Sequence, residues 1–404
     1  MFDAVGHDRP TSGRLVACFA AALLGALALA LALGLAGVAR AQSPNPLFKG
    51  IKQGSSDPGV SFFAGQFRVT SSRGARVRTS PDLVNWRQDK RLFARRGAPR
   101  WAVGRRIGSS KIYFLPAIKR YVLVFDALHR IKGKFCIGRA TSKRPYGFRN
   151  MGRESARGPL ECEGPGLSRS AYSLLDPDLF QDPATGSYYL LYKRQLQSRI
   201  DEPPQPSDIV IRPIGPDAKS GLGAPTRLVV AAGKGTKEGV SVEAPTMVAR
   251  NGRYFLFYSI ANFTNDSYAV SVAASRREAN TPLGGNFVKF GANPIYSGKP
   301  DKDFCGVGHQ DVMQTGPDAW VLFAHAYLIE RPPAKPGGNA RCVSKPVRPG
   351  GRTPRRQLVA DQLRWDVPST NPQNTQEGFA WPSVNDGTPS GNGQPRGKLT
   401  PASG

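Results

Sequence analysis

Several common catalytic and metal-binding patterns are missing from this chain of 404 residues. No G-x-S-x-G, H-E-x-x-H or P-loop pattern occurs, which excludes the usual serine esterases, zinc proteases and nucleotide hydrolases. No C-x-x-C occurs either, so we expect no cysteine-based zinc site. No long segment after residue 42 keeps the apolar spacing of an amphipathic helix. The chain is therefore not expected to be a largely helical protein.

Acidic residues are scarce: 29 Asp and Glu stand against 56 Lys and Arg, which gives a formal net charge of +27. Such a charge attracts polyanions. No helix-turn-helix, RNP or zinc-finger pattern accompanies it, so we expect no nucleic-acid partner. We expect instead an acidic polysaccharide or an anionic wall or membrane surface. The alternative is that basic pairs such as Arg95-Arg96 and Arg105-Arg106 are only solvated faces.

One long apolar segment stands near the amino terminus. Residues 15–39 carry no charge and consist mostly of Leu and Ala, between Arg14 and Arg40. They end in Ala39-Arg40-Ala41, an A-x-A cleavage pattern. We predict a signal peptide over residues 1–41 and a protein secreted to the extracellular space or cell wall. The alternative is an uncleaved membrane anchor, because the segment is long enough to span a bilayer.

Cysteines are few, and one of the five lies in the leader. The other four allow three pairings, and an exported protein meets conditions in which disulfides form. Their grouping along the chain favours the pairs Cys136–Cys162 and Cys305–Cys342.

Five segments repeat one plan: an apolar strand, a short turn and a second strand that opens with an aromatic residue. The intervals between these aromatics are 54, 67, 66 and 66 residues, and the aromatics are Phe67, Tyr121, Tyr188, Tyr254 and Trp320. A further strand follows each repeat, and repeats of three to four antiparallel strands arranged radially form a β-propeller. We therefore predict an all-β chain, with a five-bladed β-propeller over residues 42–390 and a disordered tail over residues 391–404.

Three carboxylates stand at similar places in three repeats. Asp57, Asp176 and Glu243 lie 10, 12 and 11 residues before their aligned aromatics. Because the first strand of a propeller blade lines the central channel, we expect these acids to converge at one end of the axis. Acids that share a pocket shift one another's pKa, and two acids flanking a bond are what glycoside hydrolysis needs. The alternative is that each is a rim acid on a hairpin.

The segments that carry these acids resemble a known family. They are D-P-G-V from Asp57, L-D-P-D-L-F-Q-D from Leu175, V-E-A-P-T-M-V-A-R-N-G-R-Y-F-L-F-Y-S from Val242 and G-V-G-H-Q-D-V-M from Gly306. Together with S-P-D-L-V-N-W and I-G-R-A-T-S-K-R-P-Y-G-F, they are similar to the signature segments of glycoside hydrolase family 43, in the same order over residues 45–390. That family consists of inverting, five-bladed enzymes that act mostly on α-L-arabinofuranosides and β-D-xylosides.

The resemblance implies a role for each acid. Asp57 matches the general base that activates water, and Glu243 matches the general acid that protonates the leaving oxygen. Asp176 matches the third carboxylate, which raises the pKa of the acid and orients it. His309 matches a histidine near the axis, often beside a metal ion such as calcium, and Arg356 matches a substrate-binding arginine. Beyond such a calcium ion, we expect no cofactor.

Other residues carry alternatives. Trp101 is either a sugar-stacking platform that binds substrate or ordinary packing, and it opens Trp101-Ala102-Val103 where the family commonly has W-A-P. The third blade continues with Y-K-R-Q from Tyr192, a second departure, so the substrate is the least determined feature. Asp178 is expected to be a turn or rim acid, and His325 is expected in the core.

Two functions from different classes remain. The first is an inverting glycosidase of pentose-containing plant-type polysaccharide, most of all an α-L-arabinofuranosidase or arabinanase. The second is a catalytically inactive propeller that binds acidic glycans through its basic surface. A retaining fructan-type hydrolase of the neighbouring propeller clan is disfavoured, because its W-M-N-D-P-N start is absent. The presence of all three carboxylates favours the first function, and we expect a monomer that takes a polysaccharide or oligosaccharide substrate.

Overall fold

Two compact units divide the chain, residues 1–41 and residues 42–404, and every described residue belongs to the second. The predicted signal peptide and the predicted tail over residues 391–404 lie outside the described residues. Within the part that is described, no helix is long and apolar enough to cross a membrane. The computed structural model describes residue 45 and residues 55–72, 76–150, 158–163, 172–196, 205–219, 221–275, 281–284, 286–298, 304–328, 356–368 and 380–390.

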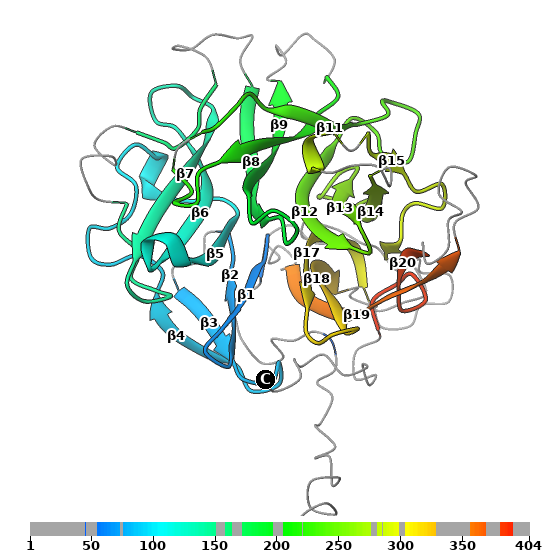
Figure 1. The fold of residues 1–404 in the computed structure, drawn as a ribbon, viewed down its shortest axis with the longest axis horizontal. Coiled ribbons are helices and arrows are strands. Elements are labelled where there is room, and N and C mark those ends of the chain that lie inside the picture. Colours follow the sequence, from blue (N-terminus) through cyan, green and yellow to red (C-terminus); the bar gives the residue numbers. More distant parts are fainter. Residues whose placement is uncertain are drawn as a thin grey trace, which may run out of the picture. The chain divides into compact units, whose positions relative to one another are not determined.

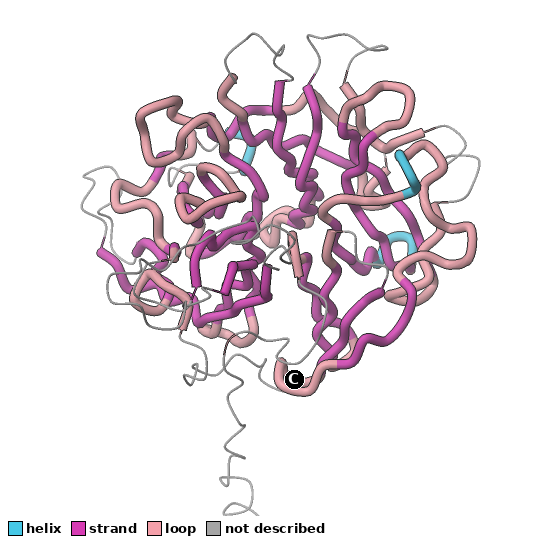
Figure 2. Tube along the Cα trace, turned by 180° about the vertical axis from the view of Figure 1, so that it is seen from behind, coloured by secondary structure: helices cyan, strands magenta, loops and turns pink. Residues whose placement is uncertain are grey.

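Five antiparallel sheets surround a central axis, and the first strand of each sheet lies innermost (Figure 1). The predicted all-β, five-bladed propeller is thus confirmed. Helical residues in the described ranges are confined to short 3-10 turns (Figure 2). These turns are η1 (Val103–Arg105), η2 (Pro116–Ile118) and η3 (Pro282–Gly284).

The blades follow one another along the chain. Blade 1 has the strand order β1-β2-β3-β4, with β1 (Gly59–Phe63), β2 (Gln66–Thr70), β3 (Arg76–Ser80) and β4 (Arg87–Arg91). Blade 2 has the order β5-β6-β7, with β5 (Ser110–Leu115), β6 (Arg120–Leu128) and β7 (Phe135–Ser142). Blade 3 has the order β8-β9-β10-β11, with β8 (Tyr172–Gln181), β9 (Tyr188–Leu196), β10 (Asp208–Ile214) and β11 (Thr226–Val230).

The last two blades are built in the same way. Blade 4 has the order β12-β13-β14-β15, with β16 also paired to β14, and comprises β12 (Val242–Arg250), β13 (Arg253–Ile260), β14 (Ala269–Ala274), β15 (Val288–Lys289) and β16 (Tyr296–Ser297). Blade 5 has the order β17-β18-β19-β20, with β17 (Phe304–Gln314), β18 (Trp320–Leu328), β19 (Arg356–Pro368) and β20 (Ala380–Val384). Each aligned aromatic stands at or next to the first residue of the second strand of its blade.

The hydrophobic core lies between neighbouring blades rather than inside one sheet. Each of the five blade junctions holds one apolar cluster. The inner strands are therefore covered on both faces, and every residue of β13 is buried. This explains why the strands read as continuous apolar runs instead of alternating patterns.

Blade 5 closes the ring against blade 1. Val60 and Phe67 pack with Phe323 and Leu358 in one buried cluster, and the rings of Phe67 and Phe323 lie 6.4 Å apart. Asn45 strengthens the closure, because its Nδ2 donates to Ser390 Oγ over 2.9 Å and its Oδ1 accepts the backbone N–H of blade 5 residue Ala360. The backbone takes part as well, because the N–H of Ser55 donates to the carbonyl oxygen of Arg356 over 2.8 Å.

A disulfide joins Cys136 to Cys162, as the grouping of the cysteines predicted. It ties the start of β7 to the segment that leads into blade 3. Cys305 is also disulfide-bonded. Its predicted partner Cys342 lies outside the described residues, so that pairing stays a prediction.

The close approach of blades 1 and 2 at the axis generates a stability prediction. A Cβ atom on Gly59 would lie 2.1 Å from the backbone oxygen of Ser110, so Gly59→Ala should force β1 and β5 apart. We expect it to lower the free energy of unfolding by about 1–3 kcal/mol, the usual range for overpacking. Gly291→Ala is the control, since its Cβ would meet nothing within 4 Å. Equal urea midpoints for the two variants would contradict this account of the axis.

Candidate active site at the propeller axis

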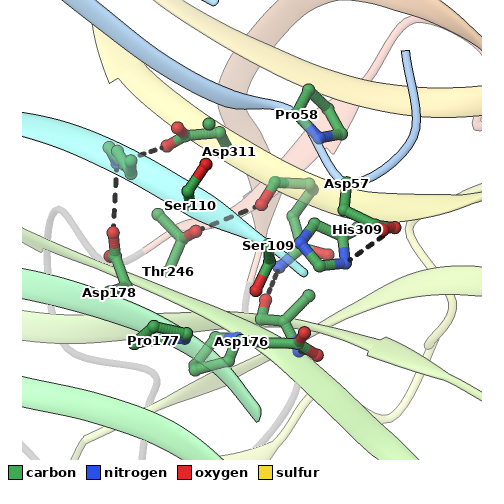
Figure 3. Close-up of a pocket in the computed structure, with 15 residues that line it drawn as sticks. Asp57, Pro58, Ser109, Ser110, Asp176, Pro177, Asp178, Thr246, His309 and Asp311 are labelled. Atoms are coloured by element: carbon green, nitrogen blue, oxygen red, sulfur yellow. Dashed lines mark hydrogen bonds and ion pairs between the residues drawn. The ribbon is translucent and has the colours of Figure 1, made fainter. Parts of the chain in front are cut away.

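Five three-residue segments, one from each blade, line a pocket at the axis (Figure 3). Each segment belongs to the innermost strand of its blade or directly precedes it. The segments are residues 57–59, 109–111, 176–178, 244–246 and 309–311.

Four of these segments open with the same unusual backbone bend. Asp57, Asp176, Ala244 and His309 have φ angles of 51°, 55°, 51° and 51°. Residues other than glycine seldom adopt positive φ, and such strain persists where the surroundings hold it. In blades 3, 4 and 5 the bend coincides with a register shift between the first two strands. Bulges of this kind re-aim side chains near active sites.

The structure brings Asp57, Asp176 and Glu243 together, but not from equivalent positions. Asp57 and Asp176 each open a segment, whereas Ala244 opens the fourth and Glu243 stands one residue before it. The backbone N–H of Ala244 donates to Asp176 Oδ2 over 3.1 Å, which places the Glu243 segment directly beside Asp176. The charges of Glu243 and Asp57 both act on Asp176, so the three carboxyl groups share one electrostatic environment.

Asp57 is surrounded by groups from blade 5. Its Oδ1 lies 3.0 Å from Arg356 Nη1, 3.4 Å from His309 Nδ1 and 3.5 Å from His325 Nδ1. Burial by itself would raise the pKa of Asp57, but the charges of His309, Arg356 and His325 outweigh it and hold that pKa well below its ordinary value. Asp57 is therefore ionised, as a general base must be. Arg356 was predicted to bind substrate, and in the structure its guanidinium group forms an ion pair with Asp57.

Glu243 is held by two residues that the sequence did not single out. Lys193 Nζ lies 2.8 Å from Glu243 Oε2, and the hydroxyl of Tyr268 donates to Oε1 over 2.6 Å. Burial would raise the pKa of Glu243, but Lys193 and the Tyr268 hydroxyl together lower it. The expectation that the pKa of Glu243 is raised is therefore not met, because the Lys193 cation, 2.8 Å from its carboxylate, lowers it.

Asp176 has the raised pKa instead. Burial is the main cause, and the charge of Glu243 adds to it, while His309 and Lys193 act in the opposite direction. The backbone N–H of Asp176 donates to Asp126 Oδ2 over 3.0 Å. The carboxyl group of Asp126 is buried beside that of Asp176, which raises the pKa of Asp126 to about 7. Asp126 is thus a fourth carboxyl group in the site, and it was not predicted from the sequence.

Asp126 belongs to a second ring of polar residues beneath the first. Each member contacts a residue that was assigned to the site: Ser72 and His325 act on Asp57, Lys193 holds Glu243, and Ser259 accepts the backbone N–H of His309 over 2.7 Å. A sequence signal for this ring exists, since each member stands five residues after the aligned aromatic of its blade. The members are Ser72, Asp126, Lys193, Ser259 and His325.

Further along the inner strands, Lys111 ties three blades together across the axis. Its Nζ lies 2.7 Å from Asp311 Oδ1 and 3.2 Å from Asp178 Oδ1 (Figure 3). The prediction that Asp178 is a turn or rim acid is wrong, since its side chain is buried and faces the axis. The prediction fails because Asp178 follows the bend at Asp176, which turns it inward.

Trp101 lies apart from the pocket. It is 6% exposed and packs in the cluster between blades 1 and 2, where its ring stacks on Phe125 and His129. The position that lines the axis in blade 2 is Ser109 rather than the tryptophan segment. This placement favours the packing alternative for Trp101.

His309 lies in the pocket as predicted, but the groups around it do not fit a calcium site. Calcium takes six to eight oxygen ligands. Among the described residues, no cluster of three or more His, Cys, Asp or Glu side chains has an arrangement that could hold a metal ion. Nδ1 of His309 faces Asp57, whose carboxylate is also bound by Arg356. No step of the chemistry is therefore assigned to a metal.

The fold and the pocket define a class of protein: five-bladed propellers with carboxyl groups clustered on the axis. Residues 50–368 match the family described as Glycosyl hydrolases family 43, and the chain belongs to this family. It is therefore a glycoside hydrolase by family. No curated protein matches the chain.

Solved structures with this fold include enzymes of different specificity. A thermostable family-43 glycoside hydrolase is 22% identical with a TM-score of 0.66, over 90% of this chain and 100% of that one. An endo-1,4-beta-xylanase from Bacteroides thetaiotaomicron is 21% identical with a TM-score of 0.57, over 82% and 94%. An alpha-L-arabinofuranosidase from Lactobacillus brevis is 17% identical with a TM-score of 0.58, over 87% and 98%. At these identities the likeness shows the fold.

The raised pKa of Asp126 should make the free energy of unfolding depend on pH. In the native protein its pKa is about 7, against an ordinary value of 3.8. Between these values the native state binds more protons than the unfolded state, so Asp126 makes the free energy of unfolding fall as pH rises through this window. Asp126→Asn has no proton to lose. We expect the difference in stability, variant minus parent, to grow by up to about 1.4 kcal/mol per pH unit.

Urea unfolding at four pH values between 4.5 and 7.5 measures this difference. A difference that stays constant over the window would show that Asp126 does not carry the extra proton.

Proposed function

We propose that this protein is an inverting glycosidase that cleaves pentose-containing polysaccharide, and that α-L-arabinofuranosidic bonds are the bonds it cleaves best. The observation that carries the proposal is that Asp57, Asp176 and Glu243 all lie near His309 at the axis, with Asp57 held ionised. Asp57 and Asp176 line the pocket, and Glu243 stands one residue before the lining residue Ala244. Membership of the family supports hydrolysis of a glycosidic bond. A secreted protein, released by cleavage of residues 1–41, is part of the proposal.

Asp57 is the base in this mechanism. Its carboxylate accepts a proton from a water molecule as the water oxygen bonds to the anomeric carbon. The glycosidic C–O bond breaks on the opposite face of the sugar, and the configuration inverts. Arg356 keeps Asp57 ionised, and His325 fixes its position by accepting the backbone N–H of Asp57, so a proton is accepted at a defined oxygen.

Glu243 is the acid, and it gives its proton to the leaving oxygen. The reaction therefore needs Glu243 in the protonated form, which Lys193 disfavours. Asp176 and Asp126 keep protons more readily than an ordinary aspartate. Asp176 lies beside the Glu243 segment and Asp126 lies beside Asp176, so a proton can pass along these carboxyl groups to Glu243 after each turnover.

Arabinofuranose is proposed as the sugar because of the sequence resemblance and because one of the similar folds is an arabinofuranosidase. Pentose release from debranched arabinan, branched arabinan, arabinoxylan and aryl xylosides distinguishes the choices. Arabinose from arabinan supports the proposal, whereas xylose as the product from arabinoxylan or aryl xylosides would replace it with a xylosidase.

The two catalytic roles predict different responses to the leaving group. Glu243→Gln should lose about 10²–10⁴-fold in kcat on polysaccharide, because an alcohol leaving group needs a proton. It should keep much of its activity on a 2,4-dinitrophenyl arabinofuranoside, whose leaving group needs none. Asp57→Asn should be inactive on both substrates, since water is not activated. Loss of both activities in Glu243→Gln would remove Glu243 from the role of acid.

The charge of Lys193 should influence the alkaline limb of the pH profile of kcat/KM. Lys193→Met removes the charge that lowers the pKa of Glu243, so Glu243 stays protonated to higher pH. We expect the alkaline limb of kcat/KM to move to higher pH in this variant. Lys193→Arg keeps the charge and is the matched control, for which the limb should stay in place. Identical limbs in all three proteins would show that Glu243 does not set it.

A further inference from the structure

A strongly basic surface lies beside the pocket on blade 2. We define the basic rim as residues 100–108 and 129–132, which contain five cationic residues and no Asp or Glu. The five are Arg100, Arg105, Arg106, Arg130 and Lys132. The four arginines are all exposed, and none of them takes part in an ion pair with the described residues.

The two parts of the basic rim are joined to each other. Ala102 and His129 form a β-bridge, and the backbone N–H of Arg130 donates to the carbonyl oxygen of Trp101 over 2.9 Å. Trp101 also stacks on His129. The buried tryptophan therefore supports the loop from which the arginines project, which agrees with its place in the core between blades 1 and 2.

The basic rim is also attached directly to the site. β6 carries Asp126 into the second ring, and the hairpin with His129 and Arg130 begins three residues later. Gly108 ends the other part of the rim, and its backbone N–H donates to the carbonyl oxygen of Asp126 over 2.8 Å. A Cβ on Gly108 would lie 1.9 Å from Asp126 Oδ1, so this end of the rim packs tightly on the site. Arg105 and Arg106 therefore stand four and three residues before Ser109, which lines the pocket.

The cations of the site and those of the rim differ in whether a carboxylate already binds them. At the axis Lys111, Lys193 and Arg356 are each bound by a carboxylate of the protein, so they are not available to a carboxylate of the substrate. The rim presents unpaired guanidinium groups, whose planar donors match carboxylates in two-point hydrogen bonds. A substrate with a neutral sugar at the bond and carboxylates on the neighbouring chain fits both surfaces.

We propose that the basic rim binds the carboxylate groups of a uronic-acid-containing polysaccharide whose neutral pentose branches enter the pocket. This inference rests on the proposed function for the identity of the branch, and the binding of the acidic chain is independent of it. Val103 and Ile131 of the rim are also exposed, at 47% and 69%. An anionic membrane surface is therefore the competing partner, and it enters the test as an outcome.

The test compares two triple variants with the same loss of charge. Arg105→Gln, Arg106→Gln and Arg130→Gln change the basic rim. The matched control replaces exposed cations at the ends of strands on the opposite side of the blades, namely Arg87→Gln, Lys119→Gln and Arg120→Gln. Both triples are made in the full chain and in Glu243→Gln, so that binding is measured without turnover.

Binding of polygalacturonate, which has no pentose, is measured at low salt and again with added sodium chloride. We expect the rim triple to bind about tenfold more weakly than the parent at low salt, and the control triple to bind nearly as the parent does. The difference should shrink as salt screens the charges. In the active enzyme, the ratio of kcat/KM for pectin-linked arabinan over free arabinan should fall about tenfold in the rim triple.

Equal losses in the two triples would overturn the proposal, because net charge rather than the rim would then be responsible. So would rim-dependent binding to phosphatidylglycerol vesicles without rim-dependent binding to polygalacturonate, which would assign the rim to a membrane. If the parent releases no pentose from any substrate, the proposed function fails. Rim-dependent polygalacturonate binding in that case would still support the rim as an acidic-glycan surface.

Discussion

The active pocket depends on a left-handed bend repeated at the head of the inner strands. The bend leaves a backbone N–H at the axis, and in three blades a side chain on the second strand of the preceding blade accepts it. A buried N–H without a partner is costly, so these side chains are as necessary as the bend itself. The pairs are Asp57 with His325, Asp176 with Asp126, and His309 with Ser259.

One consequence is that each part of the site is built by two blades. The acceptor for the N–H of Asp57 comes from blade 5, so Asp57, the proposed base, is positioned only when the ring has closed. The fourth bend, at Ala244, is different because its N–H is accepted by the carboxylate of Asp176. Asp176 therefore supports the backbone beside Glu243, and its carboxyl group also interacts electrostatically with that of Glu243.

The electrostatic design gives each acid its own environment. Asp57 has Arg356 and two histidines, Glu243 has Lys193 and a tyrosine hydroxyl, and Asp176 has a buried carboxyl neighbour. Carboxyl groups that act on one another's charge thereby acquire different proton affinities, which is what the proposed acid and base chemistry requires.

The sequence by itself determined the architecture and most of the acids. The regular spacing of Phe67, Tyr121, Tyr188, Tyr254 and Trp320 predicted five blades, because each aromatic opens a second strand and enters a core between blades. The same alignment placed Asp57, Asp176 and Glu243 at one end of the axis. The members of the second ring also stand at one fixed place in the alignment, five residues after each aromatic. A single polar residue in an apolar strand does not stand out, however, until the pairing of the strands shows what it faces.

Tertiary structure alone decided which groups face one another. The bend at Asp176 turned Asp178 to the axis, and the bulge in blade 4 put Glu243 one residue away from the position equivalent to Asp57. Lys193 reached Glu243 from the neighbouring blade and reversed the expected direction of its pKa. These outcomes depend on contacts across blade junctions, between residues as far apart as Asp57 and Arg356. Spacing along the chain reports the period of the strands, and it carries no information about the distance between side chains of different blades.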